Sequence, residues 1–222
     1  MSAPLIRPPE IVCRWLGRVS FAAALALQEE LVAEKIADAA APDTLLLLEH
    51  EPVFTIGRTP DQTSLREAAR LPHPVVQINR GGQATYHGPG QLVGYPILDL
   101  QTRGQDLHRY LRALESLLIA TCAAFGVTAT RRAGLTGVWI GERKLASIGV
   151  GVRRWIAMHG FALNVSGPLD GFAHIVPCGI AGVEMTSIER ECGRAVAVEE
   201  VAARVAALAP AALAAPLPAE GG

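Results

Sequence analysis

Between Leu107 and Phe125, apolar side chains recur every three or four residues, which is the spacing of one face of an α-helix. The set comprises Leu107, Tyr110, Leu111, Leu114, Leu117, Leu118, Cys122 and Phe125. We expect a helix from about Asp106 to Phe125, with Gly126 suited to the position after its end. Such a helix must bury its apolar face against another layer, and shorter apolar runs along the chain supply that layer.

These shorter runs predict strands at residues 11–16, 44–49, 53–57, 75–79, 92–99, 138–140, 144–152 and 155–165. Ser20 suits the N-cap of a helix reaching about Ala39, and residues 198–208 suit a last helix. Gly141 and Glu142 fit a two-residue hairpin turn. Hairpin strands beside a few helices predict an α/β (α+β) fold, in which a mixed β-sheet has flanking helices.

Composition limits the class of protein. The chain has 222 residues, of which 50% are hydrophobic and 18% charged, so it can bury a sizeable core. A net charge of -1 argues against a protein that coats nucleic acid. The start of the chain contains Pro8 and Pro9 and does not resemble a secretory signal, and Arg204 and Pro210 interrupt the best candidate for a membrane span. We therefore expect a cytoplasmic protein with one domain over residues 10–208 and flexible termini at residues 1–9 and 209–222.

The segment from residue 80 to residue 91 is the most unusual part of the sequence. It contains Arg80, Gly81, Gly82, Gln83, Ala84, Thr85, Tyr86, His87, Gly88, Pro89, Gly90 and Gln91. Glycines let a backbone approach a ligand closely, and the polar side chains add directional contacts, so the segment predicts a binding loop. The alternative is a long hairpin or an Ω-loop. The chain has no GxxxxGK[ST] phosphate loop and no GxGxxG motif, so nothing in it favours nucleotide binding.

Cys178 stands apart from the other three cysteines. It follows Pro177 and precedes Gly179, so its thiol would be held on a rigid turn that a substrate carbonyl can approach. The alternative is a structural cysteine. We expect Cys13 and Cys122 to be inert core thiols and Cys192 to lie in an exposed polar turn.

A nucleophilic thiolate needs a stabilising partner, and both His174 and Lys144 are candidates. Lys144 enters an otherwise apolar strand directly after the predicted turn, where burial would favour its neutral form and its charged form would pair with a thiolate. The alternative is a solvated hairpin lysine. His87 and His159 both precede glycine, and we place them as pocket residues, against the alternative of hydrogen-bonded structural histidines. No histidine or cysteine spacing predicts a metal site.

Residues 131–154 form a basic segment with a net charge of +5, because Glu142 is its only acid. Its members are Arg131, Arg132, Arg143, Lys144, Arg153 and Arg154. This segment predicts a surface for an acidic protein partner, or else an ordinary solvated strand edge.

Taken together, the motifs resemble those of the lipoyl(octanoyl) transferases, the lipoate biosynthesis protein B family. The matching segments are residues 48–57, 80–91, 144–149, 159–165 and 177–180, in family order, within a resemblance over about residues 11–208. Leu145 stands where the family usually has isoleucine, which is a mild apolar change.

The resemblance implies a fold similar to the catalytic domain of biotin and lipoate protein ligases. It implies an acyltransferase that moves octanoyl from octanoyl-acyl carrier protein to a lysine of a lipoyl domain. Cys178 would be the acyl-thioester nucleophile, and Lys144 would lower its pKa. The implied substrate site comprises Arg80, Gly81, Gly82, Gln83, Ala84, Thr85, Tyr86 and His87, then Ser147, Ile148 and Gly149, then Gly160, Phe161 and Ala162, with His159 as pocket support.

The resemblance also implies the partners. The donor would be the carrier protein, with the acyl group on its phosphopantetheine, and the acceptors would be lipoyl domains of 2-oxoacid dehydrogenase complexes and the glycine cleavage H protein. No ATP, metal, nucleic acid or membrane is expected, and the chain is taken to act as a monomer. Two alternatives are an ATP-dependent lipoate or biotin ligase on the same fold and a non-catalytic module that docks carrier domains.

Overall fold

The centre of the fold is a mixed sheet of seven strands in the order β1-β2-β6-β10-β9-β8-β7. The computed structural model describes residues 11–58, 63–65, 70–179, 182–214 and 216–217, with Cys178 described by its backbone alone. The strands are β1 (Ile11–Val19), β2 (Asp43–His50), β6 (Gln91–Ile97), β7 (Thr130–Arg132), β8 (Leu135–Ile140), β9 (Arg143–Arg153) and β10 (Ile156–Asn164). β1 and β2 are parallel, and the other neighbouring pairs are antiparallel. The predicted α/β (α+β) fold with a mixed sheet is confirmed.

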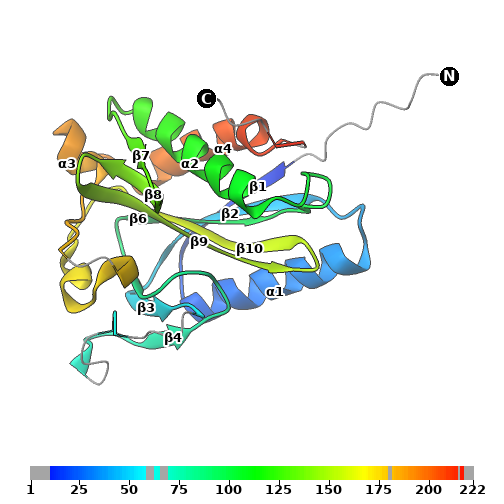
Figure 1. Ribbon diagram of the computed structural model, residues 1–222, viewed down its shortest axis with the longest axis horizontal. Coiled ribbons are helices and arrows are strands. Elements are labelled where there is room, and N and C mark those ends of the chain that lie inside the picture. Colours follow the sequence, from blue (N-terminus) through cyan, green and yellow to red (C-terminus); the bar gives the residue numbers. More distant parts are fainter. Residues whose placement is uncertain (1–10, 59–62, 66–69, 180–181, 215, 218–222) are drawn as a thin grey trace.

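Helices cover both faces of this sheet, as Figure 1 shows. They are α1 (Phe21–Ala37) on one face and α2 (Leu107–Ala123) with α4 (Val198–Ala212) on the other. Ala24 of α1 packs with Leu46 and Leu48 of β2, whereas Leu114 of α2 and Val201 of α4 belong to the main core on the opposite face. The sheet is therefore buried on both sides, which explains the nearly continuous apolar run in β2.

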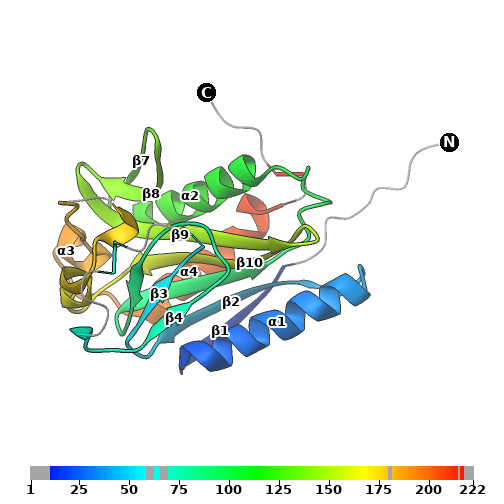
Figure 2. The same ribbon diagram turned by 60° about the horizontal axis from the view of Figure 1, so that its bottom comes forward.

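A smaller sheet of three strands lies beside the main one (Figure 2), in the order β4-β3-β5. Its strands are β3 (Val53–Ile56), β4 (Val75–Gln77) and β5 (Thr85–His87). The strand predicted at residues 53–57 does not continue the strand before it, because the chain turns at Glu51 and Pro52 and Val53 pairs with His87. The glycine-rich loop, defined here as residues 78–84, joins β4 to β5 and is thereby held next to the main sheet.

The predicted caps and turns have local physical causes. The Ser20 hydroxyl accepts from the Ala23 N–H at 3.3 Å and begins α1 as predicted. Gly141 has φ +57° in the predicted turn between β8 and β9. A second two-residue turn, at Arg154 and Trp155 between β9 and β10, has φ of 52° and 65°. Neither residue is typical of such a turn, where glycine, asparagine and aspartate are usual, so the turn could not be predicted.

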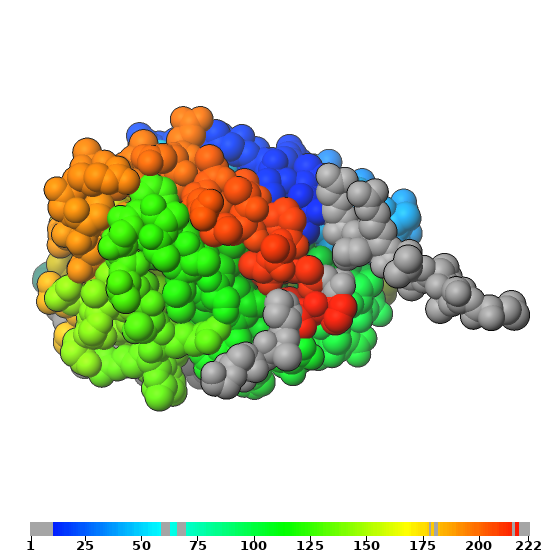
Figure 3. All heavy atoms as spheres, turned by 90° about the horizontal axis from the view of Figure 1, so that it is seen from above, coloured from blue at the N-terminus to red at the C-terminus, as the bar shows by residue number. Residues whose placement is uncertain are grey.

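The C-terminal part differs from the expectation of a flexible tail after Leu208. α4 continues to Ala212, and Leu213 and Leu217 are buried in the main core. Arg103 and Arg109 donate hydrogen bonds to the carbonyls of these two leucines. Figure 3 shows α4, in orange to red, lying across the face of α2, in green. Alanine favours helix, and two leucines add an apolar anchor, so the described part of residues 209–217 is packed.

The segment between β10 and α4 contains three short helical turns. They are η2 (Asp170–His174), η3 (Pro177–Gly179) and α3 (Ile188–Cys192). Its first part packs in a second core cluster that includes Phe54, Phe172 and Ile175, so it is anchored on the smaller sheet. Among the described residues, no helix combines the length and apolar character that crossing a membrane requires.

Candidate active site

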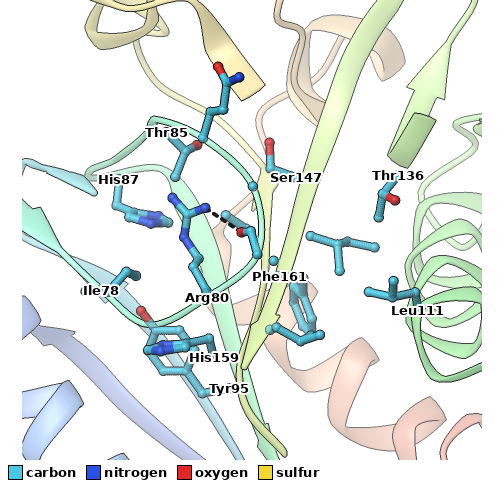
Figure 4. A pocket seen from close by; sticks show the side chains of 18 of the residues that line it. Ile78, Arg80, Thr85, His87, Tyr95, Leu111, Thr136, Ser147, His159 and Phe161 are labelled. Atoms are coloured by element: carbon cyan, nitrogen blue, oxygen red, sulfur yellow. Dashed lines mark hydrogen bonds between the residues drawn. The ribbon is translucent and has the colours of Figure 1, made fainter. Parts of the chain in front are cut away.

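A cavity of about 320 Å³ lies between the glycine-rich loop and the hairpin of β9 and β10, and Figure 4 shows part of its lining. Of the residues singled out in the sequence, it is lined by Arg80, Gly81, Gly82, Gln83, Thr85, His87, Lys144, Ser147, Ile148, Gly149, His159, Gly160, Phe161 and Ala162. The structure thus brings three separate motifs around one space.

Ala84 and Tyr86 do not line this cavity. Ala84 is fully buried in the second core cluster, and Tyr86 packs its ring on Phe54 and Phe172 at centroid distances of 5.3 and 5.6 Å. Along residues 84–87 they alternate with Thr85 and His87, which do line the cavity, so the extended chain entering and forming β5 divides the motif between two faces.

Sequence reasoning did not identify a second group of lining residues. They are Phe21, Ile78, Tyr95, Leu111, Gly134, Leu135, Thr136 and Val150. Most are apolar and belong to elements predicted only for the core, so their residue types gave no functional signal. Figure 4 places Tyr95 beside His159, and Leu111 and Thr136 on the far side of β9.

Close backbone approach explains the glycines of β9. Gly81 N–H donates to Val150 O at 3.0 Å, so the glycine-rich loop lies directly on the strand. A Cβ atom at Gly149 would come within 3.0 Å of Gly81 O, and one at Gly151 within 2.6 Å of Asn79 O. Side chains at 149 and 151 would therefore push the loop off the strand and open the cavity wall.

Arg80 organises the polar side of the cavity. Its guanidinium is largely buried and donates to Thr55 Oγ1 at 2.9 Å and to Thr55 O at 3.2 Å. Thr55 Oγ1 lies 3.4 Å from His87 Nε2, and His87 Nδ1 lies 2.8 Å from Gln91 Oε1. Since Gln91 Oε1 can only accept, Nδ1 carries the proton and Nε2 accepts from the threonine hydroxyl.

Three histidines around this cavity remain neutral because they are buried. Burial, and then the neighbouring His50, lowers the pKa of His87 to about 3. Burial also lowers the pKa of His50 to about 4, partly offset by its hydrogen bond with Val19 O. The His50 Nε2 atom lies 2.7 Å from the Tyr95 hydroxyl. Both ring nitrogens of His87 have hydrogen-bond partners in Thr55 and Gln91, so the ring is held in one orientation.

His159 differs from the other two. It is 2% exposed, lines the cavity and has a left-handed backbone with φ 56°. Burial, followed by the charges of Arg80 and Arg58, lowers its pKa to about 4. Neither ring nitrogen has a hydrogen-bond partner among the residues that the structure describes. A neutral imidazole in this position offers one donor and one acceptor to a ligand.

Lys144 is buried, with 1% of the residue exposed, so the alternative of a solvated hairpin lysine does not apply. Its Nζ lies 5.2 Å from the centre of the Trp139 ring. A Cβ at Gly137 would come within 3.0 Å of Lys144 Cε, so the absence of a side chain there leaves room for the lysine. Its N–H donates to Glu184 O at 2.8 Å, and its carbonyl accepts from the Thr186 N–H at 3.0 Å. The segment that follows η3 thus forms a short parallel bridge with the lysine.

Cys178 lies in η3, and its side chain is outside the part of the structure that is described. The turn itself packs on the cavity wall, because a Cβ at Gly179 would overlap the Gln83 side chain. Val176, just before the turn, donates its N–H to Ser64 O at 2.8 Å. The fold therefore holds the Cys178 backbone against one lining residue of the cavity that contains Lys144. His174, the other candidate partner, has an exposed side chain and does not line that cavity.

The other cysteines have different surroundings. Cys122 is buried, and burial raises its pKa to about 12, in agreement with an inert core thiol. Cys13 is half-buried, and burial raises its pKa as well. Cys192 was expected in an exposed turn, but it is half-buried at the end of α3. No cluster of three or more potential metal-ligating side chains occurs among the described residues.

Ion pairs neutralise much of the predicted basic segment. Arg131 binds Glu115 of α2, Arg132 binds Glu142, and Arg143 binds Glu191 of α3. Lys144 points into the protein, which leaves Arg153 and Arg154 as the exposed arginines of the set without an ion pair in the described structure. Acids distant in sequence are thus brought to the segment by folding, so its local net charge overestimates its surface charge.

Comparison with known proteins agrees with this arrangement. The model of the lipoyl protein ligase A/B catalytic domain matches residues 20–208. A protein of Geobacter sulfurreducens named octanoyltransferase is 57% identical over 192 residues, covering 86% of this chain and 80% of that protein. Another octanoyltransferase, from Geobacter metallireducens, is 54% identical and covers 88% of this chain and 90% of its own.

Solved structures share the fold at low identity. A bi-partite lipoate protein ligase from Thermoplasma acidophilum superposes with a TM-score of 0.69 at 15% identity, covering 92% of this chain and 84% of that chain. A biotin protein ligase from Aquifex aeolicus gives a TM-score of 0.52 at 14% identity, with 91% and 68% covered. These confirm the predicted likeness to the ligase catalytic domains. The chain therefore belongs to the lipoyl protein ligase A/B catalytic-domain family and, within it, to the octanoyltransferases.

Proposed function

We propose that this protein transfers an octanoyl group from octanoyl-acyl carrier protein to a lysine of a lipoyl domain, through a thioester on Cys178. The strongest support is the position of two segments at one cavity. Lys144 is buried in the cavity lining, and the turn that contains Cys178 packs on Gln83, which lines the same cavity. The family and its octanoyltransferase relatives at 54–57% identity support the same reaction.

The first step forms the acyl-enzyme. The Cys178 thiolate attacks the thioester carbonyl, and the bond between the carbonyl carbon and the carrier sulfur breaks. The carrier thiolate leaves and takes the proton that Lys144 holds. One thioester replaces another of similar energy, so this step needs no activation by ATP.

The second step forms the product. The neutral acceptor amine attacks the Cys178 thioester, an amide bond forms, and the bond to the cysteine sulfur breaks. Lys144, neutral after the first step, takes a proton from the incoming amine, so its charge returns. An amide is much more stable than a thioester, which makes the transfer run forward. No metal or nucleotide enters this route, and lipoyl domains as acceptors follow from the family.

The cavity suits an acyl chain and a polar head. Its apolar lining includes Phe21, Leu111, Leu135 and Phe161, and burial of each methylene would contribute about 0.8 kcal/mol. The N–H groups of Gly81, Ala84 and Gly179 already donate within the protein, so we assign the oxyanion to other backbone N–H groups of the glycine-rich loop or of η3.

Mass spectrometry after incubation with octanoyl-acyl carrier protein tests the proposal. We expect one added octanoyl group on Cys178, released by hydroxylamine, and none in Cys178→Ser, whereas Cys192→Ser should be acylated as the wild type is. Normal turnover of Cys178→Ser would disprove the covalent route. Release of pyrophosphate from ATP with free octanoate would instead indicate the ligase alternative.

The role of Lys144 has its own test. In Lys144→Met the alkylation rate of Cys178 should reach its half-maximum at higher pH, because the thiolate loses a neighbouring cation. Arg153→Met removes an exposed cation at the far end of β9 and serves as the control. Identical profiles for Lys144→Met and wild type would remove Lys144 from the mechanism.

A further inference from the structure

A chain of buried hydrogen bonds runs from the glycine-rich loop through β5, β6 and β10. Arg80 donates to Thr55, whose hydroxyl donates to His87 Nε2, and His87 Nδ1 donates to Gln91 Oε1. Gln91 Nε2 then donates to Asn164 Oδ1 at 3.0 Å. Each group donates a hydrogen bond to the next one, so the donor and the acceptor of every hydrogen bond in the chain are fixed.

Asn164 ends this chain at the segment that pairs with Lys144. It is 1% exposed, and its Nδ2 donates to Thr186 O at 3.0 Å. The Thr186 N–H in turn donates to the Lys144 carbonyl at 3.0 Å, and the Lys144 N–H donates to Glu184 O. One side-chain amide therefore connects the glycine-rich wall of the cavity to the backbone that fixes Lys144.

The side chain at position 164 must provide both a hydrogen-bond acceptor and a hydrogen-bond donor. Oδ1 must accept from Gln91, while Nδ2 must donate to Thr186 O, and both bonds are shielded from water. A carboxylate at this site would lack the donor and face the carbonyl oxygen of Thr186. An aliphatic side chain of similar volume would leave both partners unsatisfied, which is costly in a buried site.

We propose that Asn164 is a positioning residue for octanoyl transfer: it sets the placement of Lys144 relative to the Cys178 turn and the glycine-rich loop. Asn164 does not line the cavity, so it acts through Thr186 rather than on the substrate. The inference rests on the proposed function. Because misplacement of a catalytic group by about 1 Å can reduce a rate about 100-fold, we expect a loss of that order from Asn164→Leu.

Asn164→Asp gives a test with a chemical signature. An ionised carboxyl cannot donate to Thr186 O, but a protonated carboxyl restores the donor, and burial raises the pKa of an introduced carboxyl. The rate of Cys178 acylation relative to wild type should therefore rise about tenfold or more from about pH 8 to about pH 5.5. Asn164→Leu should stay equally impaired at both pH values.

The titratable and charged groups around this position are present in both proteins, so the ratio of rates removes their contribution. They are His87 on β5, Lys144 on β9, Glu49 on β2, and Glu191 on α3 with its partner Arg143. Thr121→Val is the matched control, because it deletes a buried hydroxyl bonded within α2, away from the cavity. It should lower the melting temperature and leave the rate unchanged.

The alkylation rate of Cys178 against pH provides a readout that needs no acyl donor. In Asn164→Leu this profile should move toward that of Lys144→Met. A wild-type rate and profile in Asn164→Leu would overturn the inference, and so would an Asn164→Asp deficit that does not change with pH. If the wild-type protein is not acylated at all, the proposed function fails, while the alkylation profiles still decide the role of Asn164.

Discussion

His50→Gln should change the acid stability of the protein by an amount that the structure specifies. His50 is fully buried between Phe21 and Tyr95, where burial holds its pKa at about 4 against 6.5 in the unfolded chain. As the pH falls below 6.5, this imidazole becomes protonated in the unfolded chain but stays neutral in the folded protein. The wild type therefore loses stability between about pH 6.5 and pH 4, and a variant without this imidazole does not lose that part.

The size of the effect follows from the two pKa values. Between pH 7.5 and pH 4.5, proton uptake by the unfolded state costs the wild type about 2.5 kcal/mol at this one residue. His50→Gln is expected to be the less stable protein at pH 7.5, because it loses contacts with Val19 and Tyr95. Its deficit should shrink by about 2.5 kcal/mol at pH 4.5 or change sign.

Urea unfolding curves at several pH values measure this difference directly. His108→Gln, on the exposed surface of α2, should run parallel to the wild type over the whole range. A deficit of His50→Gln that stays constant from pH 7.5 to pH 4.5 would refute the reasoning, because it would mean that the buried imidazole is protonated as easily as a free one. The three neutral histidines around the cavity would then need another explanation.

Three further variants test other parts of the structure. Gly151→Ala should lower both the rate of acyl transfer and the melting temperature, because its Cβ would lie 2.6 Å from a carbonyl oxygen of the glycine-rich loop. The control is Gly81→Ala, whose Cβ would lie 3.9 Å from the nearest atom, so its melting temperature should not change. Asp43→Asn should cost about 3–5 kcal/mol in urea unfolding, because it leaves two buried cations without their carboxylate. Leu213→Ala should cost about 2–5 kcal/mol, or several degrees of melting temperature, while Leu107→Ala on the exposed side of α2 should cost far less, and equal costs would contradict the packing of the C-terminal segment.

The sequence predicted those features that depend on local patterns. The apolar spacing over residues 107–125 indicated α2, Ser20 indicated the start of α1, and Gly141 indicated the turn before β9. The glycine-rich motif was found because glycine and polar residues rarely gather in that density without a reason. These patterns involve residues that are close together in the chain, so they can be recognised in a single sequence.

The remaining features depend on contacts between distant segments. Nothing in residues 130–132 distinguishes them as β7, and β5 was hidden within a motif that contains glycine and proline. Leu111 and Thr136 line the cavity only because α2 and β8 meet β9 there. Glu115 and Glu191 pair with arginines far away in the sequence, so folding reduces the predicted basic surface mainly to Arg153 and Arg154.

Backbone hydrogen bonds hold the chain on both sides of the Cys178 turn. Val176 bonds to Ser64 before the turn, and residues 184–186 pair with Lys144 after it. On the proposed route these two attachments keep the described backbone of the turn beside the cavity, so the acyl group is received and passed on at one site. On the proposed route the acyl carrier protein and the lipoyl domain therefore bind at the same opening of the cavity. The acyl carrier protein must dissociate before the lipoyl domain can bind. Steady-state kinetics would show this as parallel lines in double-reciprocal plots, the pattern of a ping-pong exchange.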